Sequence, residues 1–266
     1  MQIRRPSVST WALHPLLQTC AAGRPGNPEG RIMADGVGTL SLLEVPAALA
    51  AHGFRTMELC HFHISDPSTS YLDDLRAAIE ASGVELWSTL IDDGNITDPE
   101  NGNRDRDWIA EWIDRAAHLG SKCVRVIGGR NADSVPQSIA QLQILSDHAQ
   151  SKGVRVLTEN WFETFSVPAE LNAALEAIPE LGLCFDFGNW SGETKYGHLD
   201  QIADHATSCH AKCHYNGSTP DADDFQKCLE ITQRHQFAGP YTLVYGEAGR
   251  VWETLDEQRA LLAPYL

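Results

Sequence analysis

Short apolar runs alternate with segments of helical apolar spacing along most of the chain. A glycine separates each such segment from the run that follows it: Gly53, Gly83, Gly120, Gly153, Gly182 and Gly239. Glycine is favoured just past the end of a helix, where φ is positive and a Cβ would clash. The pattern therefore predicts a helix, a capping glycine and a strand, mostly repeating at intervals of roughly 30 residues.

Eight strands are predicted in this way. Strands with no polar face that alternate with helices indicate a parallel sheet covered by helices. Eight units in 266 residues predict a single-domain (β/α)8 TIM barrel over residues 1–266. An open doubly wound sheet is the alternative, although neither G-x-G-x-x-G after the first strand nor G-x-x-x-x-G-K-[ST] occurs. The predicted strands are Val8–Leu13, Thr56–Cys60, Glu85–Leu90, Cys123–Ile127, Val154–Thr158, Leu183–Phe185, Thr207–Ala211 and Tyr241–Tyr245.

Composition limits the kinds of partner that the protein is expected to bind and the cellular compartment in which it is expected. The formal net charge is −16 and the basic residues are scattered, which disfavours nucleic acid and anionic membranes. No signal-peptide pattern follows Met1, and no apolar run approaches the roughly 20 residues of a membrane span. The seven cysteines are an odd number and lie mostly in strand-like runs, which favours reduced thiols. We therefore expect a cytoplasmic protein with a small-molecule substrate.

Polar residues follow the predicted strands, and in a barrel the carboxyl ends of the strands meet at one mouth. Glu159, Asp186, His210 and Glu247 are spaced by about one strand-helix unit each. Carboxylates so close together repel one another unless a cation neutralises them. These four residues therefore predict a site for one divalent cation. Oxygen and imidazole ligands favour Mn²⁺, Mg²⁺ or Co²⁺, with Zn²⁺ as an alternative.

Two other interpretations of these residues stay open. A single acidic residue at a strand end is commonly a capping or ion-paired group rather than a ligand. The run Cys209-His-Ala-Lys-Cys-His214 contains the residue types of a zinc cluster. Alternate residues of a strand face opposite sides, however, so its cysteines and histidines would not easily converge. The metal site at the barrel mouth is the interpretation that we prefer.

Several short motifs resemble those of the xylose-isomerase-like barrels of sugar isomerases and epimerases. The resemblance covers nearly the whole chain, with the motifs in the family's order. Asn189 and Cys213 depart from it, where the family usually has His and Asp. The motifs are Ser7-Val-Ser-Thr-Trp-Ala-Leu-His-Pro15, Thr158-Glu-Asn160, Phe185-Asp-Phe-Gly-Asn189, His210-Ala-Lys212 and Val244-Tyr-Gly-Glu247.

The resemblance implies the same four metal ligands and a carbohydrate substrate, and it is compatible with a homo-oligomer. We expect proton transfer next to the carbonyl of a keto-sugar or related polyol, with Glu159 and Glu247 moving the proton. Lys212 would steady an oxyanion, unless it is ion-paired with Asp186 or Glu247. Further substrate contacts are expected from His14, His63, Asn189 and Trp161. Two alternatives are a lyase on the same scaffold, either a keto-inositol-type dehydratase or a carbon-glycoside deglycosylase, and a non-catalytic sugar-binding barrel.

Overall fold

Eight parallel strands close into a barrel in the order β1-β12-β9-β8-β7-β6-β5-β4. The computed structural model describes residues 3–17, 20, 21, 23, 25, 26, 31, 32 and 38–266. The predicted TIM barrel is confirmed. The strands of the barrel are β1 (Arg5–Ser9), β4 (Thr56–Cys60), β5 (Glu85–Ile91), β6 (Cys123–Val126), β7 (Arg155–Glu159), β8 (Gly182–Asp186), β9 (Ala206–His210) and β12 (Pro240–Leu243).

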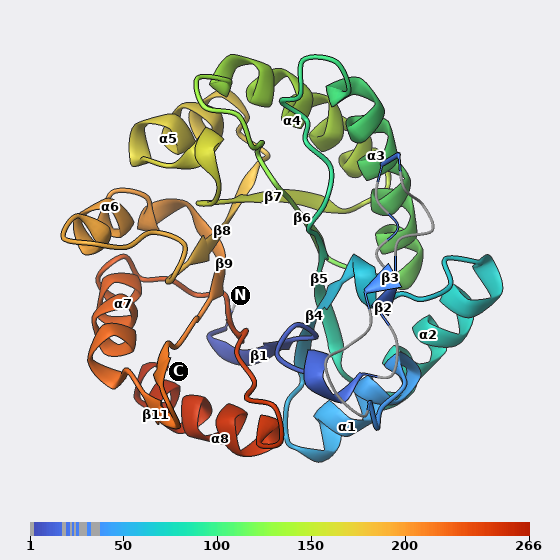
Figure 1. Ribbon diagram of the computed structural model, residues 1–266, viewed down its shortest axis with the longest axis vertical. Helices are drawn as coiled ribbons and strands as arrows, with labels where there is room; N and C mark the ends of the chain where they lie inside the picture. The colour runs from blue at the N-terminus through green and yellow to red at the C-terminus, as the bar shows by residue number, and fades with distance from the viewer. Residues whose placement is uncertain (1–2, 18–19, 22, 24, 27–30, 33–37) are drawn as a thin grey trace.

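The helices form a ring around the strands (Figure 1). Two small antiparallel pairs, β2 (Cys20–Ala21) with β3 (Arg31–Ile32) and β10 (Tyr215–Asn216) with β11 (Thr219–Pro220), lie outside the barrel sheet. None of the described helices has both the length and the apolar character that crossing a bilayer requires. The helices are α1 (Val45–Ala51), α2 (Thr69–Ser82), α3 (Gly102–Leu119), α4 (Val135–Ser151), α5 (Pro168–Ala177), α6 (Lys195–Asp200), α7 (Ala222–Arg234) and α8 (Val251–Leu262).

Helix α2 illustrates why these segments are helical. The Ser68 side chain caps its start by accepting a hydrogen bond from the backbone N–H of Tyr71. Leu72, Leu75 and Ile79 recur at helical spacing and are buried in the main core. Burying one such side chain contributes about 1.5–3 kcal/mol. The helix ends at Gly83, which has a φ of 68°.

The predicted role of the separating glycines is only partly correct. Gly53, Gly83, Gly120 and Gly153 have positive φ, as a helix-capping glycine should. Gly182 and Gly239 do not, and space explains their presence instead. A Cβ on Gly182 would lie 2.4 Å from Leu157 Cδ2, and one on Gly239 would lie 2.4 Å from the Thr207 carbonyl oxygen. These two glycines allow close packing around the strands.

The first strand was also predicted too late in the chain. Residues Val8–Leu13 were expected, whereas β1 ends at Ser9. Ala12 and Leu13 are buried and apolar, but their N–H groups bond to Ser9 and Thr10 in a turn. Apolar content alone does not distinguish a buried turn from a strand. The other seven predicted strands are confirmed within two residues at each end.

Candidate active site

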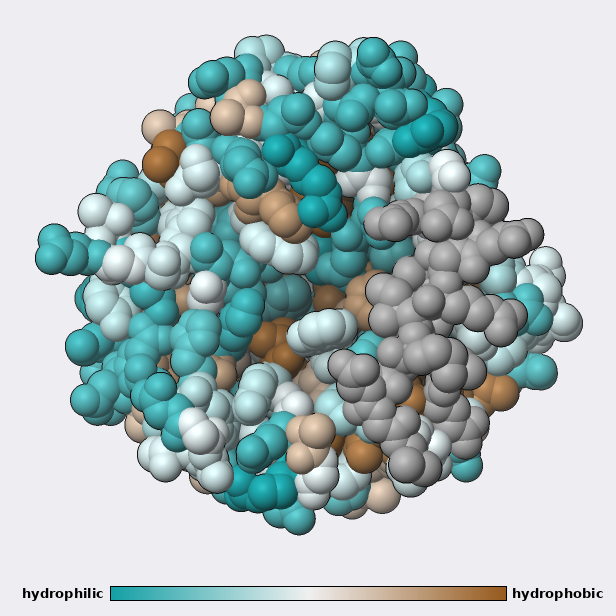
Figure 2. All heavy atoms as spheres, viewed as in Figure 1, coloured by the Kyte–Doolittle hydropathy of each residue, from teal (hydrophilic) through white to brown (hydrophobic). Residues whose placement is uncertain are grey.

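A cavity of about 400 Å³ opens where the carboxyl ends of the strands meet. Figure 2 shows a hollow near the centre of the face viewed down the barrel. Nearly every barrel strand, or the loop that follows it, contributes to the wall, so side chains far apart in sequence lie together. The lining residues are Ser9, Trp11, Cys60, Phe62, Leu90, Asp92, Arg125, Glu159, Trp161, Asp186, Asn189, His210, Lys212 and Val244.

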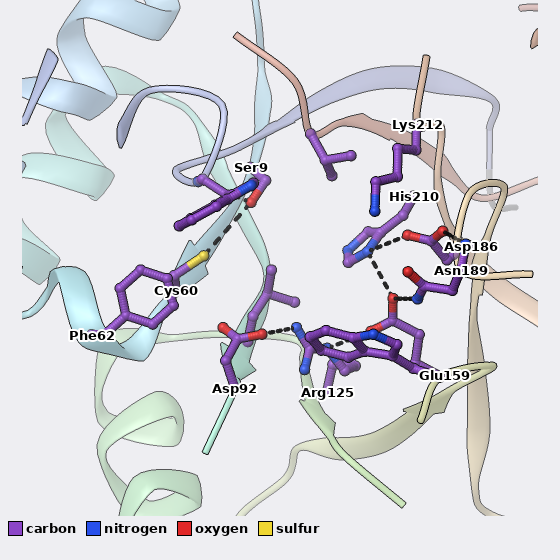
Figure 3. Close-up of a pocket in the computed structure, with 14 residues that line it drawn as sticks. Ser9, Cys60, Phe62, Asp92, Arg125, Glu159, Asp186, Asn189, His210 and Lys212 are labelled. Atoms are coloured by element: carbon purple, nitrogen blue, oxygen red, sulfur yellow. Dashed lines mark hydrogen bonds and ion pairs between the residues drawn. The ribbon is translucent and has the colours of Figure 1, made fainter. Parts of the chain in front are cut away.

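Three of the four predicted metal ligands converge on one side of this cavity (Figure 3). Glu159 Oε1 lies 3.3 Å from His210 Nδ1, and Asp186 Oδ2 lies 3.5 Å from the same nitrogen. All three side chains are at least nine-tenths buried. They end the neighbouring strands β7, β8 and β9, and Asp186 is the direct register partner of His210. The barrel therefore brings the carboxylates of Glu159 and Asp186 to the same nitrogen of His210.

Asparagine side chains and backbone amides hold the two carboxylates. Asn189 Nδ2 donates to Glu159 Oε1 at 2.8 Å, so Asn189 contacts a predicted ligand as well as lining the cavity. The N–H groups of Gly188 and Asn189 donate to Asp186 Oδ1 at 2.6 and 2.8 Å. Asn160 bonds the backbone of Asp186 through both its amide atoms. These contacts occupy Asp186 Oδ1 and leave Oδ2 to face His210.

Glu58 fixes the orientation of the His210 ring through a hydrogen bond between two strands of the barrel. Its side chain is fully buried on β4, and its Oε2 lies 2.8 Å from His210 Nε2. An ionised carboxylate only accepts hydrogen bonds, so Nε2 donates to Glu58, while Nδ1 faces the carboxylates of Glu159 and Asp186 and would give up its own proton if a cation bound there. A histidine that binds a metal usually donates its other ring N–H in this way.

Arg125 is the cation that pairs with the carboxylates in this structure. Its Nε lies 3.0 Å from Glu159 Oε2, and its Nη2 pairs with Asp92 Oδ1. Burial opposes the charge of the guanidinium, but Asp92 and Glu159 raise the pKa of Arg125 above its ordinary value. Burial by itself would raise the pKa of Asp92, but the charge of Arg125 holds the pKa of this carboxyl below its ordinary value. Arg125 thus forms its ion pairs in the wall of the cavity.

Lys212 lines the cavity beside His210 (Figure 3). Among the residues that the structure describes, the Lys212 ammonium is in no salt bridge, so the alternative pairing with Asp186 or Glu247 is not seen there. Its charge still contributes to Asp186: burial raises the pKa of that carboxyl, while a hydrogen bond with His210 and the charge of Lys212 bring it below the ordinary value. The loop glycine Gly188 makes room for the Lys212 stem.

Cys184 is a member of the site that the sequence reasoning missed. It precedes Asp186 by two positions on β8 and is the register partner of Glu159. A carboxylate oxygen of Glu159, the Cys184 sulfur and an imidazole nitrogen of His210 all lie within 4.8 Å of one another. Two-residue spacing from Asp186 on a strand was the available signal, because such residues share a face. Cys184 would offer a soft sulfur donor near the harder carboxylate oxygen of Glu159.

Glu247 does not join the three converging residues. The chain leaves the cavity wall after Val244, and Glu247 Oε2 pairs with Arg250 Nη1 at 3.0 Å. The side chain of Glu247 is 30% exposed. Gly246 fixes this path, since a Cβ there would lie 2.0 Å from the Ala12 carbonyl oxygen. The predicted ligand and proton-transfer roles of Glu247 therefore stay predictions.

The expected substrate residues divide into two groups. Asn189 and Trp161 line the cavity, and Trp161 stacks on Phe162 with ring centroids 4.1 Å apart. His14 and His63 are not among the cavity-lining residues, and His14 Nδ1 is 3.1 Å from His63 Nε2. His14 belongs to a turn five residues beyond the true end of β1. Contact of His14 or His63 with a substrate stays a prediction.

Glu159, Cys184 and His210 form the cluster that could hold a divalent cation, and Asp186 approaches this cluster through the imidazole of His210. Ligands at right angles around Mg²⁺ or Mn²⁺ lie about 3 Å apart, given metal-oxygen distances of about 2.1 Å. The separations of 3.3 and 3.5 Å from His210 Nδ1 are close to this value. Glu159 and Asp186 supply oxygen and His210 supplies nitrogen, which suits a hard cation, whereas the sulfur of Cys184 suits a softer one.

The model of the xylose isomerase-like TIM barrel family matches residues 46–253, which is most of the chain. This protein belongs to that family. The match confirms the predicted resemblance and agrees with the closed barrel.

Three individual proteins show how far the similarity extends. The putative hydroxypyruvate isomerase of Streptomyces coelicolor is 35% identical over 107 residues, or 36% of this chain and 38% of that protein. A xylose isomerase-like TIM barrel protein from Mycobacterium smegmatis, solved with magnesium, has a TM-score of 0.70 at 14% identity, over 99% of this chain and 96% of that one. The D-psicose 3-epimerase of Clostridium cellulolyticum H10, solved with D-tagatose, has a TM-score of 0.67 at 12% identity, over 100% of this chain and 98% of that one. The two structural similarities concern the fold.

Proposed function

We propose that this protein is a divalent-metal-dependent sugar isomerase or epimerase that transfers a proton next to the carbonyl of a keto-sugar or related polyol. The observation that carries the proposal is the approach of Glu159 Oε1 and Asp186 Oδ2 to His210 Nδ1 at 3.3 and 3.5 Å in the cavity wall. The isomerase and epimerase names among its relatives and structural neighbours agree with this class of reaction.

Glu159, Asp186 and His210 would hold the cation, with Mn²⁺, Mg²⁺ or Co²⁺ as the preferred metals. A bound divalent cation polarises a carbonyl and makes the adjacent C–H more acidic. Glu247 would join as the fourth ligand only after its pair with Arg250 opens. Cys184 makes Zn²⁺ the alternative, since zinc readily accepts thiolate ligands.

Side chains of the protein are assigned the two remaining roles, which are proton transfer and stabilisation of the negative oxygen. Glu159, oriented by Asn189 and Arg125, is the proposed proton-transfer group on one side, with Glu247 as its proposed partner. The ammonium of Lys212 would stabilise the negative oxygen that develops when the C–H proton leaves. Three carboxylates and two cationic side chains line the cavity, so one bound divalent cation leaves a small positive excess, suited to that oxyanion.

The proposal is tested by metal analysis of the purified protein and by proton exchange. Keto-sugars such as D-fructose would be incubated with the Mn²⁺-loaded protein in D₂O, and their mass followed. We expect deuterium in the sugar with no loss of water, whereas loss of water would indicate the lyase alternative. The Glu159→Gln variant should exchange about 10²- to 10⁴-fold more slowly.

Glu163→Gln is the matched control, because Glu163 is exposed in the same loop and lies outside the cavity. Its exchange rate should equal that of the unaltered protein. Full exchange by Glu159→Gln would contradict the role of Glu159. A purified protein that retains no divalent metal and exchanges no sugar protons when Mn²⁺ is added would overturn the proposed function itself.

A further inference from the structure

Asp92 stands on the side of the cavity away from the proposed metal ligands. It directly follows β5, and in Figure 3 it lies across the cavity from Asp186, His210 and Lys212. Asp92 lines the cavity, and 20% of its side chain is exposed there. A charged group on the wall of a ligand-sized cavity is a candidate for substrate recognition.

Three contacts from different parts of the chain hold Asp92 in place. Its N–H donates to His61 Nδ1 at 3.2 Å, and its carbonyl oxygen accepts from Arg130 Nη2 at 3.2 Å. Its Oδ1 pairs with Arg125, whose other edge atom Nε faces Glu159. One guanidinium thus links Asp92 to the proposed metal ligand Glu159. A side chain held from three directions presents a fixed point to a ligand, as specific recognition requires.

The Asp92 carboxylate can accept more hydrogen bonds than it receives in this structure. An ionised carboxylate offers about four acceptor sites. Oδ1 receives a bond from Arg125, and Oδ2 is buried without a hydrogen-bond partner. Each oxygen therefore has an unused lone pair, and a ligand group that donates a hydrogen bond to the part of this carboxylate that lines the cavity would be favoured.

The surroundings define the ligand further. Phe62, Leu90 and Cys60 line the same cavity, and they offer apolar contact to the C–H groups of a carbon chain. Arg125 is already paired with Asp92 and Glu159, so it has no charge left to neutralise an anionic group. A substrate carboxylate or phosphate next to the Asp92 carboxylate would be repelled, and the Arg130 guanidinium, which donates to the Asp92 carbonyl oxygen, is not among the cavity-lining residues. A hydroxyl-bearing carbon chain is the chemistry that this wall suits.

We propose that Asp92 is a specificity-determining residue that accepts a hydrogen bond from a hydroxyl at the end of the substrate remote from the metal ligands. This inference rests on the proposed function and deepens it. It assigns the cavity to ketoses of hexose size, and it disfavours three-carbon keto acids such as hydroxypyruvate, whose single hydroxyl is adjacent to the carbonyl and not remote from it.

Binding of a polyol that has no carbonyl, and so no reaction, tests Asp92 separately from catalysis. D-Sorbitol is the hexose-sized probe and glycerol is the three-carbon control, with binding followed by calorimetry on the Mn²⁺-loaded protein. We expect sorbitol to bind more tightly than glycerol. Asp92→Asn should weaken sorbitol binding about 10- to 100-fold, and it should leave the weaker binding of glycerol unchanged.

Asp93→Asn is the matched control, since Asp93 is the next residue and does not line the cavity. It should bind sorbitol as the unaltered protein does. Equal sorbitol affinity in Asp92→Asn and the unaltered protein would overturn the proposal. So would equal affinity of the unaltered protein for sorbitol and glycerol.

A second measurement needs no variant of Asp92 and so does not depend on its folding. The unaltered protein would be given D-fructose and a series of its monodeoxy analogues. One analogue should lose affinity by the same 10- to 100-fold factor, because it lacks the hydroxyl that Asp92 accepts. Equal affinity for all analogues would contradict the inference. Asp92-dependent sorbitol binding without any proton exchange from ketoses would instead overturn the proposed function and leave the recognition role of Asp92 standing.

Discussion

His210 illustrates how one side chain at the mouth is set by its neighbours. Glu58 Oε2 accepts a hydrogen bond from its Nε2–H at 2.8 Å, and Glu159 and Asp186 face its Nδ1. The imidazole is therefore fixed in orientation before any cation arrives, with Nδ1 toward the two carboxylates. A single buried carboxylate on another strand thus controls which nitrogen is offered as a ligand.

Glu58→Gln is expected to weaken metal binding. A glutamine in place of the carboxylate keeps the shape but accepts the Nε2 proton less strongly, or offers its own N–H instead. The Mn²⁺ dissociation constant should rise about 10- to 100-fold. Competition with a fluorescent chelator measures it directly.

Glu85→Gln is the control for this change, because Glu85 begins β5 and pairs with Arg5, away from the cavity-lining residues. Its Mn²⁺ affinity should be unchanged. An unaltered dissociation constant in Glu58→Gln would show that Glu58 does not orient the metal-binding nitrogen of His210.

At the scale of elements, strand register and one loop decide which groups meet. The strand register pairs Glu159 on β7 with Cys184 on β8, and Asp186 on β8 with His210 on β9. Asp186 therefore lies two residues farther along β8 than the residue that pairs with Glu159. The loop after β8 then passes Lys212 closely at Gly188, where a Cβ would lie 2.5 Å from Lys212 Cδ. The absence of a side chain at Gly188 is what leaves space for Lys212 in the wall.

Gly188→Ala should displace Lys212 and lower activity. We expect kcat/KM for ketose conversion to fall at least about 10-fold, while overpacking costs about 1–3 kcal/mol of unfolding free energy. Steady-state kinetics and urea unfolding measure the two effects. Gly197→Ala in helix α6 is the control, because nothing lies within 4 Å of a Cβ there. Unchanged kinetics in Gly188→Ala would mean that the position of Lys212 is not limiting.

At the scale of the whole molecule, closing the barrel buries groups that would otherwise be hydrated. His63 is 1% exposed, between His14 and Thr10. Burial, with a smaller effect from His14, lowers the pKa of His63 to about 3. Burial also lowers the pKa of His61, against the opposing charge of Asp92. Folding therefore keeps these imidazoles neutral at pH values where an unfolded chain would protonate them.

Stability should consequently fall as the pH is lowered. Below pH 6.5 the unfolded chain binds a proton at His63 that the folded chain binds only near pH 3, so acid favours unfolding across this window. Between pH 6.5 and pH 5 the loss due to His63 is about 2 kcal/mol. His63→Gln should lose less stability than the unaltered protein over this range, measured by urea unfolding with a chelator present.

His205→Gln serves as the control for this prediction, because His205 is exposed. Its loss of stability between pH 6.5 and pH 5 should match that of the unaltered protein. A His63→Gln variant with the same pH dependence as the unaltered protein would show that His63 is not the titrating group.

The sequence by itself determined the architecture and most of the mouth. Alternating apolar runs and helical segments predicted the eight strands, since a parallel strand that is buried on both faces is mostly apolar. Barrel geometry brings strand ends to one place, so Glu159, Asp186, His210 and Lys212 were placed at the mouth from strand boundaries, whereas Asn189 was predicted from the family resemblance. The prediction of the first strand was wrong because the buried turn at Ala12 and Leu13 is as apolar as a strand.

Only the tertiary structure decided which neighbours each group meets. The pairing of Arg125 with both Asp92 and Glu159 depends on side-chain directions across three strands. The placement of Cys184 beside Glu159 depends on register, and the turn of Glu247 toward Arg250 depends on the path after Val244. Sequence spacing specifies the strand on which a residue lies. It does not specify the height, the rotamer or the partner, which are fixed by packing against residues far away in the chain.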